Sequence, residues 1–396
     1  MESFFRTHEY LLEHTRASVR RPLMDEINWQ DRLIGIKGTR QVGKTTFLLQ
    51  YAKERYGKNR GCLYVNLNNF YFTTHRLADF AEEFHRGGGR VLLLDQVFKY
   101  PTWSRELREC YDRFPQLRIV FTCNSAMSLT DENSHLKGCV SVYNLRGFSF
   151  REFLNLKTGY RYSPHTLEEI RIYHEELARE VLRDTDPLPL FREYLRYGFY
   201  PFFQEGGEYE EKLLKTMNMM IELDILFVKF IELNYLARIK KLFYLLAMST
   251  GKAPNISYLA KEVDTSRATV GNYIQYLNEA RLINLLATRE QHAQGKKPAR
   301  ILLHNSNLVY CIKPNPDPME VLETFLMNVL IKDHRVYTGD RNSSFSVDDG
   351  LRFRLFREME EAERNYADEK NCVYVVGKSS IGKKNIIPLW LFGFLY

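Results

Sequence analysis

The sequence predicts an α/β protein in which a parallel sheet precedes an α-rich segment and a helix-turn-helix with a β wing. Three observations lead to this prediction. Short apolar runs with the composition of buried parallel strands occur at 32–37, 90–95 and 118–122. Helical spacing of apolar residues dominates from 163 to 233. Three short helical patterns then fill 239–280, and two further apolar runs follow within 282–304.

Length and composition limit the class of protein. A chain of 396 residues is long for a single hydrophobic core, so we expect two to four domains. Its 44% hydrophobic and 27% charged residues are typical of soluble globular proteins and argue against disorder. A net charge of +7 is compatible with a polyanionic partner but does not identify one.

We expect a cytoplasmic protein, because no targeting signal is recognisable and the cysteines follow no disulfide or zinc pattern. The first residues lack the basic and apolar regions of a secretory signal. The apolar tail at 386–396 is about half the length of a membrane-spanning helix and contains Pro388, so we expect a buried strand and no membrane contact. The six cysteines show neither C-x-x-C nor paired spacing with histidines, which supports neither a zinc site nor a disulfide framework.

A glycine-rich motif follows the first predicted strand. Residues 38–46 read GTRQVGKTT and match G-x-x-x-x-G-K-[ST] in full, and 47–51 continue as a helix. The glycines allow the backbone N–H groups to point inward, and the helix N-terminus adds partial positive charge at the phosphates. A chance match in an unrelated loop is the alternative. We expect Lys44 to reach the β/γ-phosphates and Thr45 to ligate Mg²⁺, which makes ATP and Mg²⁺ the predicted cofactors. The predicted phosphate-binding residues are Gly38, Thr39, Arg40, Gln41, Val42, Gly43, Lys44, Thr45 and Thr46.

Two polar residues follow the next predicted strands. Asp95 ends the run 90–95 and is the predicted second Mg²⁺ ligand, the alternative being an acid that caps a turn. Asn124 follows the run 118–122, where a sensor side chain could contact the γ-phosphate. A strand-end turn explains Asn124 almost as well.

Three stretches carry a family resemblance: LLLDQVFKYPTWSRELRECYDRFPQLRIVFTCNSA, VYNLRGFSFREFL and FREYLRYGFYPFF. Together with residues 38–46 they resemble a family of prokaryotic AAA+ ATPases that carry a winged helix and a restriction-nuclease-like domain of the PD-(D/E)XK type after the ATPase. The resemblance implies a P-loop NTPase fold with a helical lid, then a winged helix, then a small α/β nuclease-like domain. The implied domains are 1–160, 161–236, 237–304 and 305–396.

The sequence departs from this family at two catalytic positions. Gln96 stands where relatives have a glutamate that polarises the attacking water; an amide orients water but cannot accept its proton, so we expect binding without efficient hydrolysis. Residues 134–138 replace a stretch that bears arginine fingers, and Lys137 cannot form their bidentate contacts. Together these departures indicate a natural pseudo-ATPase. Gln96 taken alone is also compatible with an engineered trap in an active ATP-driven DNA remodeller.

The predicted helix-turn-helix offers a polar face. In the helix 266–280, Val270, Ile274 and Leu277 share one face. The opposite face and the wing present side chains able to meet bases or phosphates, namely Arg267, Thr269, Asn272, Gln275, Lys296 and Lys297. We therefore expect DNA as a partner, although winged helices also serve as protein-docking modules, and a scaffold without DNA is the alternative. One recognition helix per chain favours a homo-oligomer, or a hetero-oligomer with a related ATPase.

Two further segments give weaker predictions. The aromatic-rich stretch 191–203 is expected to pack in a core rather than to stack on bases. In the C-terminal region Glu323 lies on the first helix, but Ser344 and Arg354 stand about where the resemblance places metal ligands, and Asp348 lies in an expected turn. Because a nuclease needs converging carboxylates to hold Mg²⁺, we expect this domain not to cleave nucleic acid.

Overall fold

The computed structural model describes residues 1–131, 134–290, 298–340 and 343–396. The chain divides into two compact units, 1–147 and 148–396, each with its own core. Among the described residues, no helix combines the length and the apolar character needed to span a bilayer.

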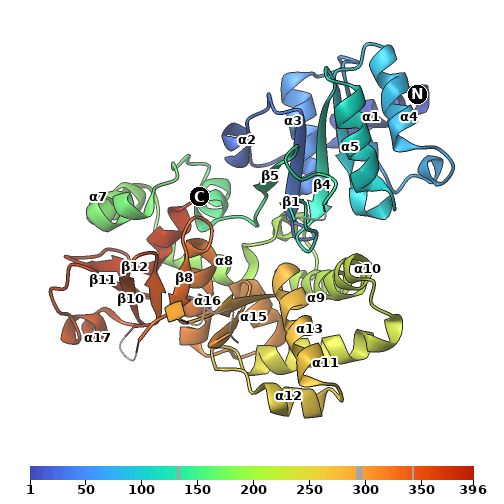
Figure 1. Cartoon of the computed structure of the whole chain (residues 1–396). Coiled ribbons are helices and arrows are strands. Elements are labelled where there is room, and N and C mark those ends of the chain that lie inside the picture. Colours follow the sequence, from blue (N-terminus) through green and yellow to red (C-terminus); the bar gives the residue numbers. More distant parts are fainter. Residues whose placement is uncertain (132–133, 291–297, 341–342) are drawn as a thin grey trace. The chain divides into compact units, whose positions relative to one another are not determined.

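The first unit is built on a five-stranded parallel sheet with the order β2-β3-β4-β1-β5, of which β1, β4 and β5 are labelled in Figure 1. Its strands are β1 (Leu33–Gly38), β2 (Cys62–Asn66), β3 (Val91–Asp95), β4 (Arg118–Asn124) and β5 (Ser141–Asn144). Its helices are α1 (Glu2–His14), α2 (Leu23–Glu26), α3 (Lys44–Arg55), α4 (Leu77–Arg86) and α5 (Trp103–Arg113). The three strands predicted from apolar runs are confirmed as β1, β3 and β4.

The sheet order brings three strand ends together. β4 lies between β1 and β3, and all three run parallel. Gly38 is in register with Asn124, and Leu94 is in register with Phe121. The carboxyl ends of β1, β3 and β4 therefore meet at one edge of the sheet, where ligands bind in open α/β folds.

The second unit begins with a helical region. Its helices are α6 (Phe150–Thr158), α7 (Leu167–Asp184), α8 (Pro187–Tyr197), α9 (Tyr209–Met219) and α10 (Leu226–Lys229). Capping boxes at Ser149 and Thr166 start α6 and α7 because each side chain accepts a backbone N–H that has no partner within the helix. The rings of Phe191 and Tyr194 are buried and pack edge-to-face against Phe150. The core role predicted for these aromatic residues is confirmed.

Three helices and a two-stranded sheet follow. They are α11 (Leu236–Met248), α12 (Ile256–Glu262), α13 (Arg267–Glu279), β6 (Ile283–Leu286) and β7 (Arg300–Leu303). α13 begins after Ser266, whose hydroxyl accepts the N–H of Thr269, and it buries Val270, Ile274 and Leu277. β6 and β7 pair antiparallel.

The last part of the second unit is a mixed sheet with the order β12-β11-β10-β9-β8. Its elements are α15 (Ser306–Ile312), α16 (Pro318–Leu330), β8 (Val336–Thr338), β9 (Phe345–Val347), β10 (Leu351–Phe356), α17 (Met359–Arg364), β11 (Cys372–Val376) and β12 (Ile386–Pro388). The tail is buried as expected, but only 386–388 is a strand, and Leu389–Phe394 is a 3₁₀ helix. Pro388 has no N–H to donate to a ladder, which is consistent with β12 ending there.

Candidate nucleotide-binding site

The loop between β1 and α3 depends on two glycines. Gly43 precedes α3 with a φ of 94°, a left-handed conformation that glycine adopts without steric cost. At Gly38, a Cβ atom would lie 2.5 Å from the carbonyl oxygen of Leu145. The two glycines of the motif thus stand at positions where a larger side chain would be strained.

Lys44 extends along this loop. Its Nζ donates to the carbonyl oxygens of Gly38 at 2.8 Å and of Thr39 at 2.7 Å. These contacts hold the ammonium group close to the backbone that the sequence predicts to surround the phosphates. The positive charge is therefore placed at the loop before any anion binds.

The carboxylate of Asp95 is the centre of the site. It is 2% exposed, and its Oδ2 accepts from the Thr45 hydroxyl at 2.6 Å and from the Tyr64 hydroxyl at 2.8 Å. Its Oδ1 accepts from the Gln96 backbone N–H at 3.0 Å and from the Thr122 hydroxyl. Burial, and next the adjacent Asp95 charge, raise the pKa of Tyr64, so its phenol stays protonated and donates. The structure thus brings together the two predicted Mg²⁺ ligands, which are 50 residues apart in the chain.

The other predicted residues lie around this centre. Gln96 follows β3 in a left-handed conformation with a φ of 56° and is half-buried. Asn124 ends β4, is buried, and pairs in register with the first glycine of the loop. Thr39 and Val42 are buried. Two loop side chains and one at the start of α3 are partly or fully exposed: Arg40, Gln41 and Thr46. Lys137 is exposed.

Two side chains at this centre were not predicted from the sequence. Thr122 donates to Asp95 and accepts the Gln96 N–H at 3.0 Å, so it links the ends of β3 and β4. Thr122 is the one polar residue in the otherwise apolar run 119–123. That interruption was a usable signal in the sequence. Tyr64 gave no such signal, because tyrosine is common in strands.

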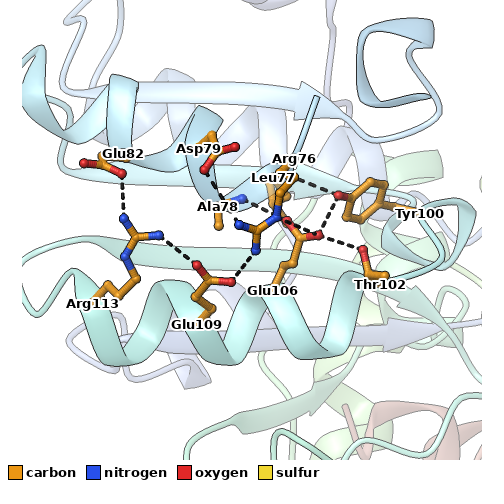
Figure 2. A network of polar contacts seen from close by, with 10 residues as sticks. All are labelled: Arg76, Leu77, Ala78, Asp79, Glu82, Tyr100, Thr102, Glu106, Glu109 and Arg113. Atoms are coloured by element: carbon orange, nitrogen blue, oxygen red, sulfur yellow. Dashed lines mark hydrogen bonds and ion pairs between the residues drawn. The ribbon is translucent and has the colours of Figure 1, made fainter. Parts of the chain in front are cut away.

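A third unpredicted residue, Glu106, holds the segment that follows β3. Its side chain on α5 is buried and accepts from the Ala78 N–H at 3.0 Å and from the hydroxyls of Tyr100 and Thr102, both at 2.7 Å (Figure 2). Tyr100 and Thr102 lie only a few residues after Gln96. Glu106 therefore ties the start of α4 and the segment that follows Gln96 to one helix, α5.

Around Glu106 lies a more exposed network of ion pairs, also drawn in Figure 2. Glu109 pairs with Arg113 at 2.7 Å and with Arg76 at 2.5 Å, and Arg113 reaches Glu82 at 2.6 Å. These groups join α4 to α5 at the surface. Exposed pairs of this kind contribute little individually, so the buried carboxylate of Glu106 is the main polar link between the two helices.

The predicted DNA-contacting side chains of α13 lie away from its buried face. Arg267, Asn272 and Gln275 are exposed, whereas Thr269 is half-buried and its hydroxyl lies 2.9 Å from that of Ser266. Lys296 and Lys297 lie outside the described residues.

The C-terminal sheet places the residues considered for metal binding in other contacts. Glu323 forms an ion pair with Arg300, and Arg354 donates to the hydroxyl of Tyr374 at 3.2 Å. Asp348 accepts from the Arg335 N–H at 2.8 Å and lies 2.6 Å from the His334 ring; burial opposes these contacts, but together they lower the pKa of Asp348. Across the part of the chain that the structure describes, no three His, Cys, Asp or Glu side chains are grouped as metal ligands.

Comparison with known proteins agrees with the architecture of the first unit. Residues 30–154 match the model of an AAA domain, and residues 188–310 match the model of a domain of unknown function (DUF8612). The chain thus carries an AAA domain in its N-terminal part, and such a domain implies nucleotide binding in general.

Individual relatives add less. An uncharacterized protein of Methanocaldococcus jannaschii is 25% identical over 278 residues, which cover 65% of this chain and 57% of that protein, so the match spans little more than half of its length. AMPPCP-bound DnaA from Aquifex aeolicus is 14% identical, with 69% of this chain and 86% of that one covered and a TM-score of 0.23. PCH-2 of C. elegans is 12% identical, with 74% and 69% covered and a TM-score of 0.23. TM-scores this low do not establish a shared overall fold.

Proposed function

We propose that this chain is an AAA+ protein that binds ATP and Mg²⁺, binds DNA through a winged helix, and uses its nucleotide state to control assembly, with weak or absent hydrolysis. The observation that carries the proposal is the 2.6 Å contact between the Thr45 hydroxyl and the Asp95 carboxylate beside the glycine-rich loop. In this proposal the parts of the chain are a nucleotide-binding core (1–160), a helical lid (161–236), a winged helix (237–304) and a degenerate nuclease-like domain (305–396).

The donor set at the loop fits Mg²⁺. Mg²⁺ prefers oxygen ligands and is commonly held by one or two protein groups together with substrate phosphates. Thr45 and Asp95 supply a hydroxyl and a carboxylate oxygen that already lie together, and Lys44 supplies a charge for the phosphates. Equilibrium binding of ATP to the purified chain, measured with Mg²⁺ and again with a chelator, tests this part of the proposal. ATP that binds equally well in both conditions would contradict the metal assignment.

The proposed weakness of hydrolysis rests on Gln96. Its backbone N–H is fixed by Asp95 and Thr122, so the side chain begins from a well-defined point at the end of β3. An amide there orients water but cannot take its proton. We expect Gln96→Glu to raise steady-state ATP turnover by about a hundredfold, the lower end of the usual range for general-base catalysis.

The control for this prediction is Gln116→Glu, which makes the same chemical change at an exposed position before β4. Phosphate release measured under saturating MgATP should not change in that variant. If Gln96→Glu also leaves turnover unchanged, Gln96 is not the cause of the impairment, and the missing arginines near Lys137 become the explanation.

The proposed winged helix comprises α11, α12, α13 and the β6–β7 pair. Supporting it are the Ser266 cap on α13, the buried stripe at Val270, Ile274 and Leu277, and the antiparallel strands that follow. Arg267 stands exposed at the start of α13, where a phosphate or a base edge can meet it. This placement favours a DNA-binding module over a protein-docking module.

We expect Arg267→Glu to weaken binding to duplex DNA about tenfold at low salt and to reduce the salt dependence of binding. Fluorescence anisotropy with a labelled duplex, repeated over a series of salt concentrations, measures both effects. Arg183→Glu, an equal charge reversal at an exposed position on α7, is the control. Salt-independent binding, or none, by the unaltered protein would favour a nucleotide-dependent protein scaffold.

A further inference from the structure

The second unit contains a cavity of about 230 Å³ that the proposed function does not use. Its walls are apolar side chains of two helices: Phe191 and Leu195 from α8, and Val321 and Leu322 from α16. We propose that this cavity binds a small carboxylate with an apolar body. The proposal rests on the second unit alone and does not depend on nucleotide or DNA binding.

The cavity opens where two parallel strands end. β10 and β11 are parallel, with Phe356 in register with Val376, and the residues immediately after them line the cavity. The Lys378 N–H donates to the carbonyl oxygen of Arg357 at 3.0 Å, so these two cationic residues lie side by side beyond the strand ends. The carboxyl ends of parallel strands are the usual position of ligand sites in open α/β sheets.

A glycine allows the strand end to approach the helix that forms one wall. A Cβ atom at Gly377 would lie 2.5 Å from the Cδ1 atom of Leu322 on α16. The close approach brings the backbone that carries Lys378 against the apolar wall. The cavity thus combines a cationic edge with an apolar interior.

The charges at this cavity are all positive. Its lining includes Arg192, Arg357 and Lys378 and no acidic residue. Lys378 is paired with Glu358 at 2.6 Å, but neither Arg192 nor Arg357 has a side-chain hydrogen bond or ion pair with any residue in the described ranges. Both arginines are exposed, so their guanidinium groups meet solvent at the edge of the cavity, where they match the anionic end of a ligand whose apolar end packs against the helices.

The volume limits the size of the ligand. A cavity of roughly 150 Å³ accommodates benzene, so a cavity of about 230 Å³ holds a body of about nine non-hydrogen atoms. A guanidinium group binds a carboxylate in a planar, bidentate arrangement, whereas an alcohol of the same length offers no charge. A straight-chain acid such as octanoate therefore has a suitable size and charge to serve as a probe.

The test is calorimetric titration of the full chain with octanoate, 1-octanol and acetate. Octanoate should bind to one site per chain, and both 1-octanol and acetate should bind at least about tenfold more weakly, because each lacks one of the two features that the cavity recognises. Saturable octanoate binding with this order supports the proposal. Equal affinity for octanoate and 1-octanol, or no saturable octanoate binding, overturns it.

Variants then locate the site. Arg357→Ala and Arg192→Ala should each weaken octanoate binding about tenfold and leave 1-octanol binding unchanged. Arg183→Ala removes an exposed arginine on α7 and should change neither octanoate binding nor 1-octanol binding. Leu188→Trp places a larger side chain at the cavity wall and should abolish octanoate binding. If Arg183→Ala weakens binding as much as Arg357→Ala does, the attraction is a nonspecific surface effect and the proposal fails.

Discussion

Replacing Lys44 with alanine is expected to lower the affinity of the protein for MgATP by about a hundredfold, which corresponds to about 2.7 kcal/mol. The side chain lies along the loop, with its ammonium within hydrogen-bond distance of Gly38 and Thr39. A charge-assisted contact with a phosphate contributes roughly 1.5 to 3 kcal/mol, and one ammonium can contact two phosphates. Titration with ATP in the presence of Mg²⁺ measures the change.

The matched control is Lys53→Ala, which removes an exposed lysine from the last turn of the same helix, α3. It alters net charge and helix composition equally but lies at the opposite end from the loop. Its ATP affinity should equal that of the unaltered protein. If Lys44→Ala also retains full affinity while remaining folded, the loop is not the nucleotide site, and the proposed function fails with it.

The glycine-rich loop and the central strands were predictable because local sequence determines them. Gly43 adopts a left-handed conformation and Gly38 a close backbone approach, and glycine meets both requirements with the least strain. Residues 91–94 are apolar throughout because β3 is buried on both faces, so a continuous run identified it. The predicted role of Asp95 as a Mg²⁺ ligand followed from its position at the end of that run.

The rest of the site depended on strand order, which a single sequence does not specify. Thr122 reaches Asp95 because β4 lies beside β3, and Tyr64 reaches it because β2 lies on the other side. Glu106 appears in the sequence as one of several acids on an amphipathic helix. Only the packing of α5 against α4 shows that its carboxylate is buried while that of Glu109 is not.

Glu106→Ala is expected to reduce the free energy of unfolding of the first unit by about 3 to 5 kcal/mol. The substitution leaves the buried Ala78 N–H and the buried Tyr100 hydroxyl without their acceptor, whereas the hydroxyl of Thr102, an exposed residue, can donate to water instead. Each buried donor without a partner costs roughly 1 to 3 kcal/mol, and breaking a buried charged network costs roughly 3 to 5 kcal/mol. The segment that carries Gln96 loses its anchor at the same time.

Glu109→Ala, one helical turn away on α5, is the control that separates the effect of a buried acceptor from the effect of losing a negative charge. It removes an acid that pairs with both Arg76 and Arg113, but its side chain is 28% exposed compared with 6% for Glu106. Because partly exposed pairs contribute about 1 kcal/mol or less, we expect a correspondingly small effect. The measurement is urea unfolding followed by tryptophan fluorescence in a Trp390→Phe background. The remaining tryptophans, Trp29 and Trp103, both lie in the first unit, so the signal reports on that unit. Equal destabilisation by the two alanine variants would show that the network acts through its charges, and not through the buried acceptor that Glu106 provides.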